Sequence, residues 1–211
     1  MIEIEHVSKY YGKNPVLRDV SLELGAGRIH GIIGRNGSGK TVLLKCVCGI
    51  VPVSEGRIVV DGKEIGRDLE MPQSVGLIIE NPGFLPNCSG WRNLQYLADV
   101  RGRIDGGRIR KAMERVGLDP DSRKWVSRYS LGMRQRLGLA QALMENPKLL
   151  ILDEPMNGLD NAGVRQVRRI LRSLRDGGRT ILLASHSTED ISSLCDTVTR
   201  LEAGRVVSHD C

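Results

Sequence analysis

Residues 34–41 read Gly-Arg-Asn-Gly-Ser-Gly-Lys-Thr, a full match to the phosphate-binding pattern G-x-x-x-x-G-K-[ST]. Glycines at this density let the backbone approach an anion closely, and successive backbone N–H groups then point inward at it. The lysine would place a positive charge on the outer phosphates of a nucleotide, and the threonine hydroxyl would bind Mg²⁺. The sequence therefore predicts nucleotide contacts from Gly34, Arg35, Asn36, Gly37, Ser38, Gly39, Lys40 and Thr41.

The segments on either side of this loop fit the context that the pattern requires. A short, mostly apolar run at 28–33 is typical of a buried parallel strand, and 40–48 is predicted to be a helix that ends at Gly49. A helix that begins at the loop would direct the positive end of its dipole at the phosphates. The alternative is a glycine-rich surface loop that fits the pattern by chance.

A second apolar strand ends in two carboxylates. Residues 149–152 are Leu-Leu-Ile-Leu, and Asp153 and Glu154 follow directly. A buried parallel strand brings its C-terminal residues to the edge of the sheet where ligands bind. We expect Asp153 to hold Mg²⁺, directly or through water, and Glu154 to act as the general base toward the attacking water. The alternative is an ordinary strand followed by an acidic turn.

The remaining pattern predicts an α/β fold, because strands alternate with helices in both halves of the chain. This alternation implies a parallel sheet covered on both faces. Residues from about 83 to 144 interrupt it and are predicted to be helical, with one apolar stripe through Trp91, Leu94, Leu97 and Ala98. Further strands are predicted at 2–6, 17–24, 56–62, 75–79, 180–184, 197–201 and 205–208, and further helices at 132–144, 161–176 and 188–194.

Length and composition favour one domain without a membrane span. The chain has 211 residues, and no segment approaches 18 consecutive apolar residues. Its N-terminus is acidic and alternating, unlike a signal peptide, so we expect a cytoplasmic protein. The five cysteines are scattered, and no second pair completes a zinc site with Cys46 and Cys48. We interpret these two as small core residues.

The net charge of +6 raises the question of a nucleic acid or an anionic membrane as partner. Much of this charge lies in the helix predicted at 161–176, opposite an apolar stripe, and we interpret it as a solvated face. Aromatic residues make up only 3% of the chain, so there are few stacking platforms for single strands. The arginines concerned are Arg165, Arg168, Arg169, Arg172 and Arg175.

Four further motifs make the chain resemble the nucleotide-binding subunits of ABC transporters. Residues 129–136, Tyr-Ser-Leu-Gly-Met-Arg-Gln-Arg, resemble the signature loop of that family, and residues 157–160 resemble its D-loop. His186 resembles its switch histidine, and Tyr11 lies where the family stacks an aromatic ring on adenine. Taken alone, Tyr11 would more often be a turn tyrosine, and His186 would more often be a capping or packing residue than a catalytic one. Ser130 could equally cap the helix that follows it.

This resemblance covers essentially the whole chain and implies both a fold and an activity. The fold would be a P-loop NTPase (RecA-like) core with an N-terminal antiparallel β-subdomain and an inserted α-helical subdomain, all within a single ABC ATPase domain at 1–211. The cofactors would be ATP and Mg²⁺. Lys40, Glu154 and His186 would act in catalysis, and Ser130 and Gly132 would complete the site of an opposing subunit.

The resemblance also implies partners. One phosphate loop and one signature per chain predict a head-to-tail homodimer, or a pair with another ABC subunit. A separate permease would form the membrane path and hold this chain at the inner face of the cell membrane. Phe84 and the Trp91 stripe would form its docking surface.

Two residues depart from the usual family pattern. Glu80 stands where the family usually has glutamine, and we expect it to face Mg²⁺. Leu131 stands where the first of two signature glycines is usual. The stretches 80–84 and 130–133 resemble the subgroup linked to export of, or immunity to, antimicrobial peptides such as bacitracin and lantibiotics.

Two other functions remain as alternatives. A soluble ABC ATPase that acts on nucleic acid or the ribosome is mildly favoured by the positive charge. Such proteins usually carry two cassettes or a long coiled coil, and this chain has room for neither, so we expect no direct nucleic acid partner. A regulatory subunit that binds nucleotide without hydrolysing it is disfavoured by Glu154 and His186.

Overall fold

The computed structural model describes residues 1–80, 82–102 and 104–210, so Asn81 of the subgroup stretch and Cys211 lie outside the described residues. The strands are β1 (Ile2–Tyr11), β2 (Asn14–Leu24), β3 (Ile29–Ile33), β4 (Glu55–Val60), β5 (Lys63–Glu64), β6 (Val75–Ile78), β7 (Leu149–Asp153), β8 (Thr180–Ser185), β9 (Thr197–Glu202) and β10 (Arg205–Asp210). The helices are α1 (Lys40–Val47), α2 (Gly90–Arg101), α3 (Gly106–Arg115), the 3₁₀ turn η1 (Val126–Arg128), α4 (Leu131–Met144), α5 (Asn161–Asp176) and α6 (Thr188–Leu194).

A central six-stranded sheet in the order β10-β9-β3-β8-β7-β6 carries the loops that matter for function. Its strands from β9 to β6 are parallel, and β10 pairs antiparallel with β9. Strands β3, β7 and β8 are fully buried, as expected for parallel strands that are covered on both faces. The predicted α/β fold with a covered parallel sheet is therefore confirmed.

The two faces of this sheet belong to two separate cores. Side chains of α1 and of the first strands pack against one face, through residues such as Ile32, Ile151 and Leu182. Side chains of α4, α5 and α6 pack against the other face, through Ile29, Leu150 and Leu183. Cys46 and Cys48 are buried in the first core as predicted, and burial raises the pKa of the Cys46 thiol to about 11.

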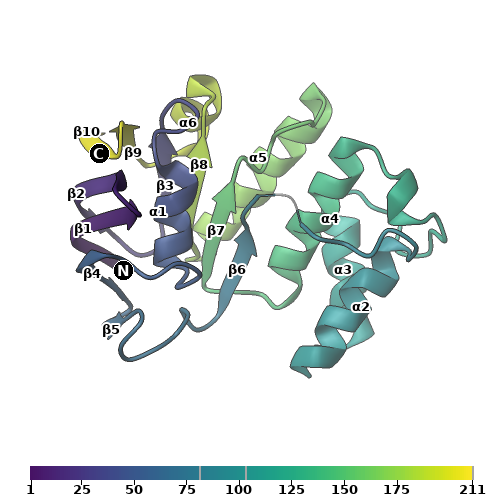
Figure 1. The fold of residues 1–211 in the computed structure, drawn as a ribbon. Coiled ribbons are helices and arrows are strands. Elements are labelled where there is room, and N and C mark those ends of the chain that lie inside the picture. The colour runs from purple at the N-terminus through teal and green to yellow at the C-terminus, as the bar shows by residue number, and fades with distance from the viewer. Residues whose placement is uncertain (81, 103, 211) are drawn as a thin grey trace.

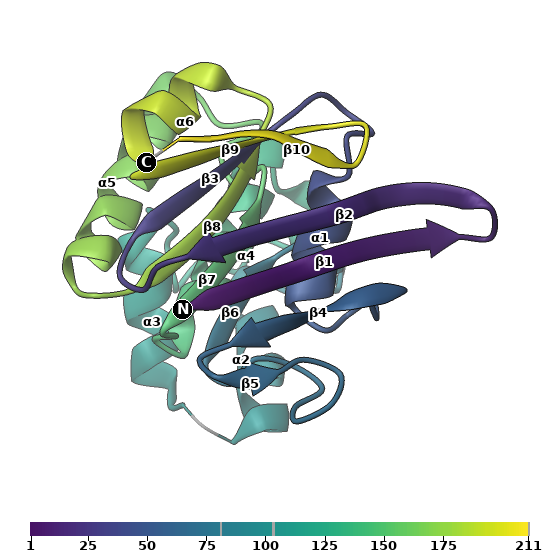
Figure 2. The same cartoon turned by 90° about the vertical axis from the view of Figure 1, so that its left-hand side faces the viewer.

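The predicted N-terminal β-subdomain is a second sheet, in the order β2-β1-β4-β5, with antiparallel pairing throughout. Figure 2 shows β1 and β2 as a long hairpin that extends away from the central sheet. Both strands are longer than predicted, because the polar residues near the turn pair across the hairpin without being buried. Tyr11 and Asn14 are the last such pair.

Helices α2, α3 and α4 follow β6 and lie on the opposite side of the molecule from β1 and β2 (Figure 1). The apolar stripe predicted on α2 is only partly correct. Leu94 and Ala98 are buried, whereas 39% of Leu97 is exposed. Trp91 is half-buried against the core, with the Arg110 guanidinium 5.7 Å from its ring centroid. Tyr96 and Val100 extend an exposed apolar surface from Leu97 along α2.

Within the described residues, no helix is both long enough and apolar enough to span a bilayer.

Candidate active site

The phosphate-binding loop connects β3 to α1, and two of its glycines are required by close packing. Gly39 has φ 104°, and a Cβ there would lie 2.9 Å from the carbonyl oxygen of Val16. A Cβ on Gly34 would overlap the carbonyl oxygen of Leu201. The loop is therefore fixed between β2 and β9, with its N–H groups beside the first turn of α1.

Lys40 lies across this loop. Its Nζ donates to the carbonyl oxygen of Gly34 at 2.6 Å and to that of Arg35 at 3.3 Å. The side chain is buried, although it carries an ammonium group. These two carbonyls hold the charge over the loop, where an outer phosphate oxygen would be its natural counter-ion.

Thr41 and Asp153 meet at the adjoining edge of the sheet. The Thr41 hydroxyl donates to Asp153 Oδ2 at 2.6 Å. The other carboxylate oxygen, Oδ1, is buried and has no hydrogen-bond partner within the described parts of the chain. Burial raises the pKa of Asp153, an effect that the Thr41 hydrogen bond partly offsets.

These donors fit Mg²⁺. The ion usually takes one or two protein carboxylates together with phosphate oxygens and water, and an unpaired buried carboxylate oxygen is the kind of ligand it needs. A bound cation would also neutralise a carboxylate that is otherwise buried without compensation.

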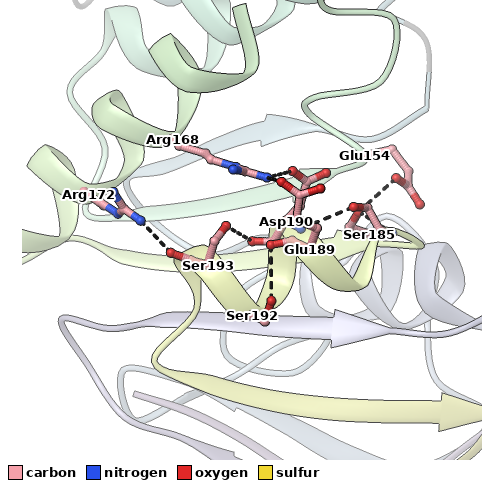
Figure 3. Close-up of polar contacts among 9 residues, drawn as sticks. Glu154, Arg168, Arg172, Ser185, Glu189, Asp190, Ser192 and Ser193 are labelled. Atoms are coloured by element: carbon pink, nitrogen blue, oxygen red, sulfur yellow. Dashed lines mark hydrogen bonds and ion pairs between the residues drawn. The ribbon is translucent and has the colours of Figure 1, made fainter. Parts of the chain in front are cut away.

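Glu154 follows Asp153 with its backbone in the left-handed region, at φ 48°. Its N–H donates to the carbonyl oxygen of Ala184 at 2.9 Å, and its own carbonyl oxygen accepts from Gln135 Nε2 at 3.1 Å. Its carboxylate accepts from the Ser185 hydroxyl at 3.4 Å, as Figure 3 shows. Sequence reasoning missed Gln135 and Ser185, and their spacing from Glu154 gave no local signal for either contact.

His186 lies beside Glu154. Its Nδ1 is 2.9 Å from Glu154 Oε1, while 60% of the side chain remains exposed. The cap of α6 is not His186 but Ser187, whose Oγ accepts from the backbone N–H of Asp190. The structure therefore brings His186 to the candidate general base and leaves the capping role to its neighbour.

Helix α5 holds this region through the arginines that we predicted to be solvated. Arg168 Nη2 lies 2.6 Å from Asp190 Oδ1 in α6, and only 17% of its side chain is exposed. Arg172 donates to the carbonyl oxygen of Ser193, and Arg175 pairs with Asp196. The prediction was wrong for Arg168 and Arg175, because acidic groups of α6 and of the approach to β9 face them. Arg172 stays exposed as predicted, although Figure 3 shows it donating to Ser193.

Glu80 is also in a left-handed conformation, at φ 58°. Its Oε1 lies 2.5 Å from Lys45 Nζ on α1, and 62% of the side chain is exposed. Its charge is a minor contributor to the raised pKa of Asp153, behind burial and the charge of Glu154. Glu80 thus lies near the candidate metal site, but its carboxylate pairs with a lysine.

Tyr11, Ser130 and Gly132 are not brought to this site. Tyr11 lies at the end of the β1–β2 hairpin, half-exposed, with Lys9 Nζ 5.3 Å from its ring centroid. Ser130 caps α4, and its Oγ accepts from the N–H of Met133 at 3.2 Å. Gly132 packs against the carbonyl of Gly158 in the loop at 157–160.

Two cavities open at the phosphate-binding loop. The smaller, of about 230 Å³, is lined by Val16, residues 36–42, Asp153 and Glu154. The other, of about 570 Å³, is lined by the loop, His186 and residues 200–203. A larger cavity of about 680 Å³ lies elsewhere, between residues 71–75 and Arg101, and contains none of the candidate site residues. The chemistry of the side chains, not cavity size, locates the site.

Comparisons with known proteins agree with this geometry. A family model described as "ABC transporter" matches residues 17–157. The chain is 41% identical to an uncharacterized ABC transporter ATP-binding protein of Bacillus subtilis, over 98% of this chain and 94% of the relative. It is 41% identical to a bacitracin transport ATP-binding protein of Enterococcus faecalis, over 98% of this chain and 68% of the relative. It is 36% identical to a lantibiotic transport ATP-binding protein of Streptococcus pyogenes, over 98% and 89%.

Solved structures show the same fold. An ATP-binding subunit of an ABC transporter superposes with a TM-score of 0.88 at 25% identity, over 99% of this chain and 89% of that chain. A dimeric bacterial ABC transporter cassette superposes with a TM-score of 0.90 at 20% identity, over 100% of this chain and 98% of that chain.

Proposed function

This chain belongs to the ABC transporter family as one of its ATP-binding ATPase subunits, and we propose that it hydrolyses MgATP in a head-to-tail dimer to drive a separate membrane permease. One observation carries the proposal. A carboxylate–histidine pair, Glu154 and His186, lies next to a phosphate-binding loop and to an unpaired buried carboxylate oxygen. The whole chain, 1–211, acts as a single domain with residues 83–144 as its helical subdomain.

Each side chain then has a defined task. The loop N–H groups and Lys40 would hold the phosphates, and Thr41 and Asp153 would hold Mg²⁺, which would supply positive charge to neutralise them. Glu154 orients a water molecule and accepts its proton at the carboxylate. His186, with Nδ1 at Glu154, lines the same cavity as the phosphate-binding loop, so its other ring nitrogen would serve an outer phosphate oxygen.

The residues that do not reach this site support the proposed dimer. Ser130 and Leu131 are exposed at the N-terminus of α4 and line neither cavity at the loop. In a two-fold head-to-tail pair, Ser130 and Gly132 complete the site of the opposing subunit, with the α4 dipole directed at its phosphate. Tyr11 stacks on adenine from the hairpin. The pair is a homodimer or is formed with another ABC subunit.

The permease docks on the helical subdomain and holds the chain at the inner face of the membrane. We assign this surface to Leu85, Tyr96, Leu97 and Val100, which are exposed and apolar. Phe84 and Trp91, which we expected from the sequence to form this surface, are partly buried and pack toward the core. Glu80 connects the metal site to this subdomain.

The cargo is an antimicrobial peptide or a similar amphipathic compound, which is exported. The relatives named for bacitracin and lantibiotic transport support this assignment. The alternative, action on nucleic acid or the ribosome, loses its main argument because three of the arginines behind it contact α6 or the approach to β9. Purification from detergent extract tests the choice. A co-purifying membrane protein supports transport, and a ribosome-associated fraction without one contradicts it.

Replacing Lys40 by alanine is expected to weaken ATP binding and leave the fold intact. The change removes a charge-assisted contact worth about 1.5–3 kcal/mol, so affinity falls about ten- to a hundredfold. Isothermal titration with ATP measures the effect, and Lys111→Ala, at an exposed position of α3, is the control. An unchanged affinity in the Lys40 variant would remove the basis of the nucleotide site.

Replacing Glu80 by glutamine is expected to shift the Mg²⁺ dependence of ATPase activity by up to about fivefold, the range for an exposed charge. Glutamine cannot form the ion pair with Lys45 and brings no charge to the metal. Lys45→Met is the matched variant, because it breaks the same pair and keeps the carboxylate. If the Mg²⁺-dependence curves of wild type and Glu80→Gln coincide, Glu80 has no role in the use of the metal.

A further inference from the structure

The position of His186 depends on how α6 is attached to the rest of the molecule. Only His186 and Ser187 join the end of β8 to the start of α6. Strand β8 is buried in the central sheet and cannot shift easily. The placement of His186 against Glu154 therefore depends on the first turn of α6.

That first turn has no apolar anchor. Helix α6 is seven residues long, and its buried residues, Ile191 and Leu194, lie in its second half. Its first three residues are Thr188, Glu189 and Asp190, and such a short helix has little stability of its own. Contacts from outside the helix must hold this end.

Arg168 of α5 supplies such a contact. Its Nη2 lies 2.6 Å from Asp190 Oδ1 and 3.3 Å from Glu189 Oε1. Only 17% of the Arg168 side chain and 15% of that of Asp190 are exposed, whereas 84% of Glu189 is exposed. The pair with Asp190 is thus shielded from solvent and is the stronger of the two contacts.

Hydrogen bonds connect Asp190 to Glu154 and so to the catalytic pair. Its backbone N–H donates to Ser187 Oγ, and the N–H of Ser187 donates to Ser185 Oγ. The Ser185 hydroxyl in turn donates to Glu154 Oε2 (Figure 3). A series of polar contacts thus runs from α5 to the general base, and it involves both chain neighbours of His186, Ser185 and Ser187.

We propose that Arg168 is a positioning residue for ATP hydrolysis: through Asp190 it fixes the first turn of α6 and so holds His186 against Glu154. The role rests on the function proposed above, because it presumes that His186 acts on bound nucleotide. Arg168 itself touches no nucleotide. Its replacement acts on the rate of the chemical step and spares ATP binding.

The first test is kinetic. Arg168→Met is expected to lower kcat by about ten- to a hundredfold, as misplaced catalytic groups do, with the KM for ATP within about twofold of wild type. Arg168→Lys keeps the charge and restores part of the rate. Arg169→Met, at the next and exposed position of α5, leaves both constants unchanged. In a His186→Ala background, Arg168→Met causes no further loss.

The second test needs no activity. The imidazole signals of His186 in nucleotide-free protein, assigned with His186→Gln, are followed by NMR. Arg168→Met is expected to shift or broaden them, and Arg169→Met is not. If wild type hydrolyses no ATP, the proposed function fails while this measurement still decides whether Arg168 places His186.

The proposal is overturned if the His186 signals stay unchanged in Arg168→Met. A change in the melting temperature of that variant would not rescue it, because overall stability does not report on the position of His186. It is also overturned if Arg168→Met lowers kcat as much without His186 as with it, because the effect would then reach catalysis by another route.

Discussion

Glutamine in place of Glu154 is expected to stop ATP hydrolysis while ATP still binds. The change keeps the shape of the side chain and removes the group that accepts the proton from water. General bases contribute about 10²–10⁴ in rate, so phosphate release should fall by at least a hundredfold. The left-handed backbone at 154 and its hydrogen bonds to Ala184 and Gln135 do not involve the carboxylate and should remain.

The same variant reports on assembly. If hydrolysis is the step that reopens a closed pair, Glu154→Gln with MgATP should elute from size exclusion as a dimer, and wild type as a monomer. Glu114→Gln, an exposed carboxylate in α3, is the control and should behave as wild type in both assays. A Glu154 variant that retains hydrolysis would end its assignment as the base.

The second large effect is expected from asparagine in place of Asp153. Asparagine keeps an acceptor for the Thr41 hydroxyl but removes the negative charge and the unpaired oxygen. Mg²⁺-dependent ATPase activity should fall by about two orders of magnitude or more, the range of electrostatic terms at active sites. Mg²⁺ should no longer improve nucleotide binding, which a titration with and without the metal measures.

Although Asp153→Asn should lose activity, the metal-free variant should not lose thermal stability. Burial raises the pKa of Asp153, so the folded protein binds a proton there more readily than the unfolded chain. Its ionised form therefore costs stability as the pH rises above the ordinary value for aspartate. Without metal at neutral pH, Asp153→Asn should melt no lower than wild type, and MgATP should raise its melting temperature less. A variant that melts well below wild type would mean that the carboxylate is structural.

Local chemistry made much of the site predictable. The loop at 34–41 and the carboxylates at 153–154 are short segments whose residue types predict their place in the fold, which the structure confirms, and their roles, which stay predictions. The contacts of Glu154 with Gln135 and Ser185 were not predictable, because they join segments 19 and 31 positions apart and depend on how α4 and β8 pack. Arg168 and Arg175 of α5 were predicted wrongly for the same reason. A helix pattern shows which side is polar but not what faces it.

Packing also explains one departure from the family pattern. The side chain of Leu131, which is 55% exposed, lies against Gly158, where φ is 74°. A Cβ on Gly158 would overlap the leucine. The larger residue in the signature therefore needs a glycine in the neighbouring loop of the same chain.

The hydrogen bond from Gln135 to the carbonyl of Glu154 has a consequence for timing. Ser130 and Gln135 are five positions apart around the start of α4, about 7.5 Å along its axis. In the proposed pair, Ser130 would contact the phosphate bound by the neighbouring subunit, while Gln135 holds the backbone carbonyl of Glu154 in its own subunit. A hydrogen bond tolerates displacements of only a few tenths of an ångström. The general base of each subunit would therefore be in place only when its Ser130 contacts nucleotide bound by the neighbour. ATP hydrolysis at the two sites would then be coupled.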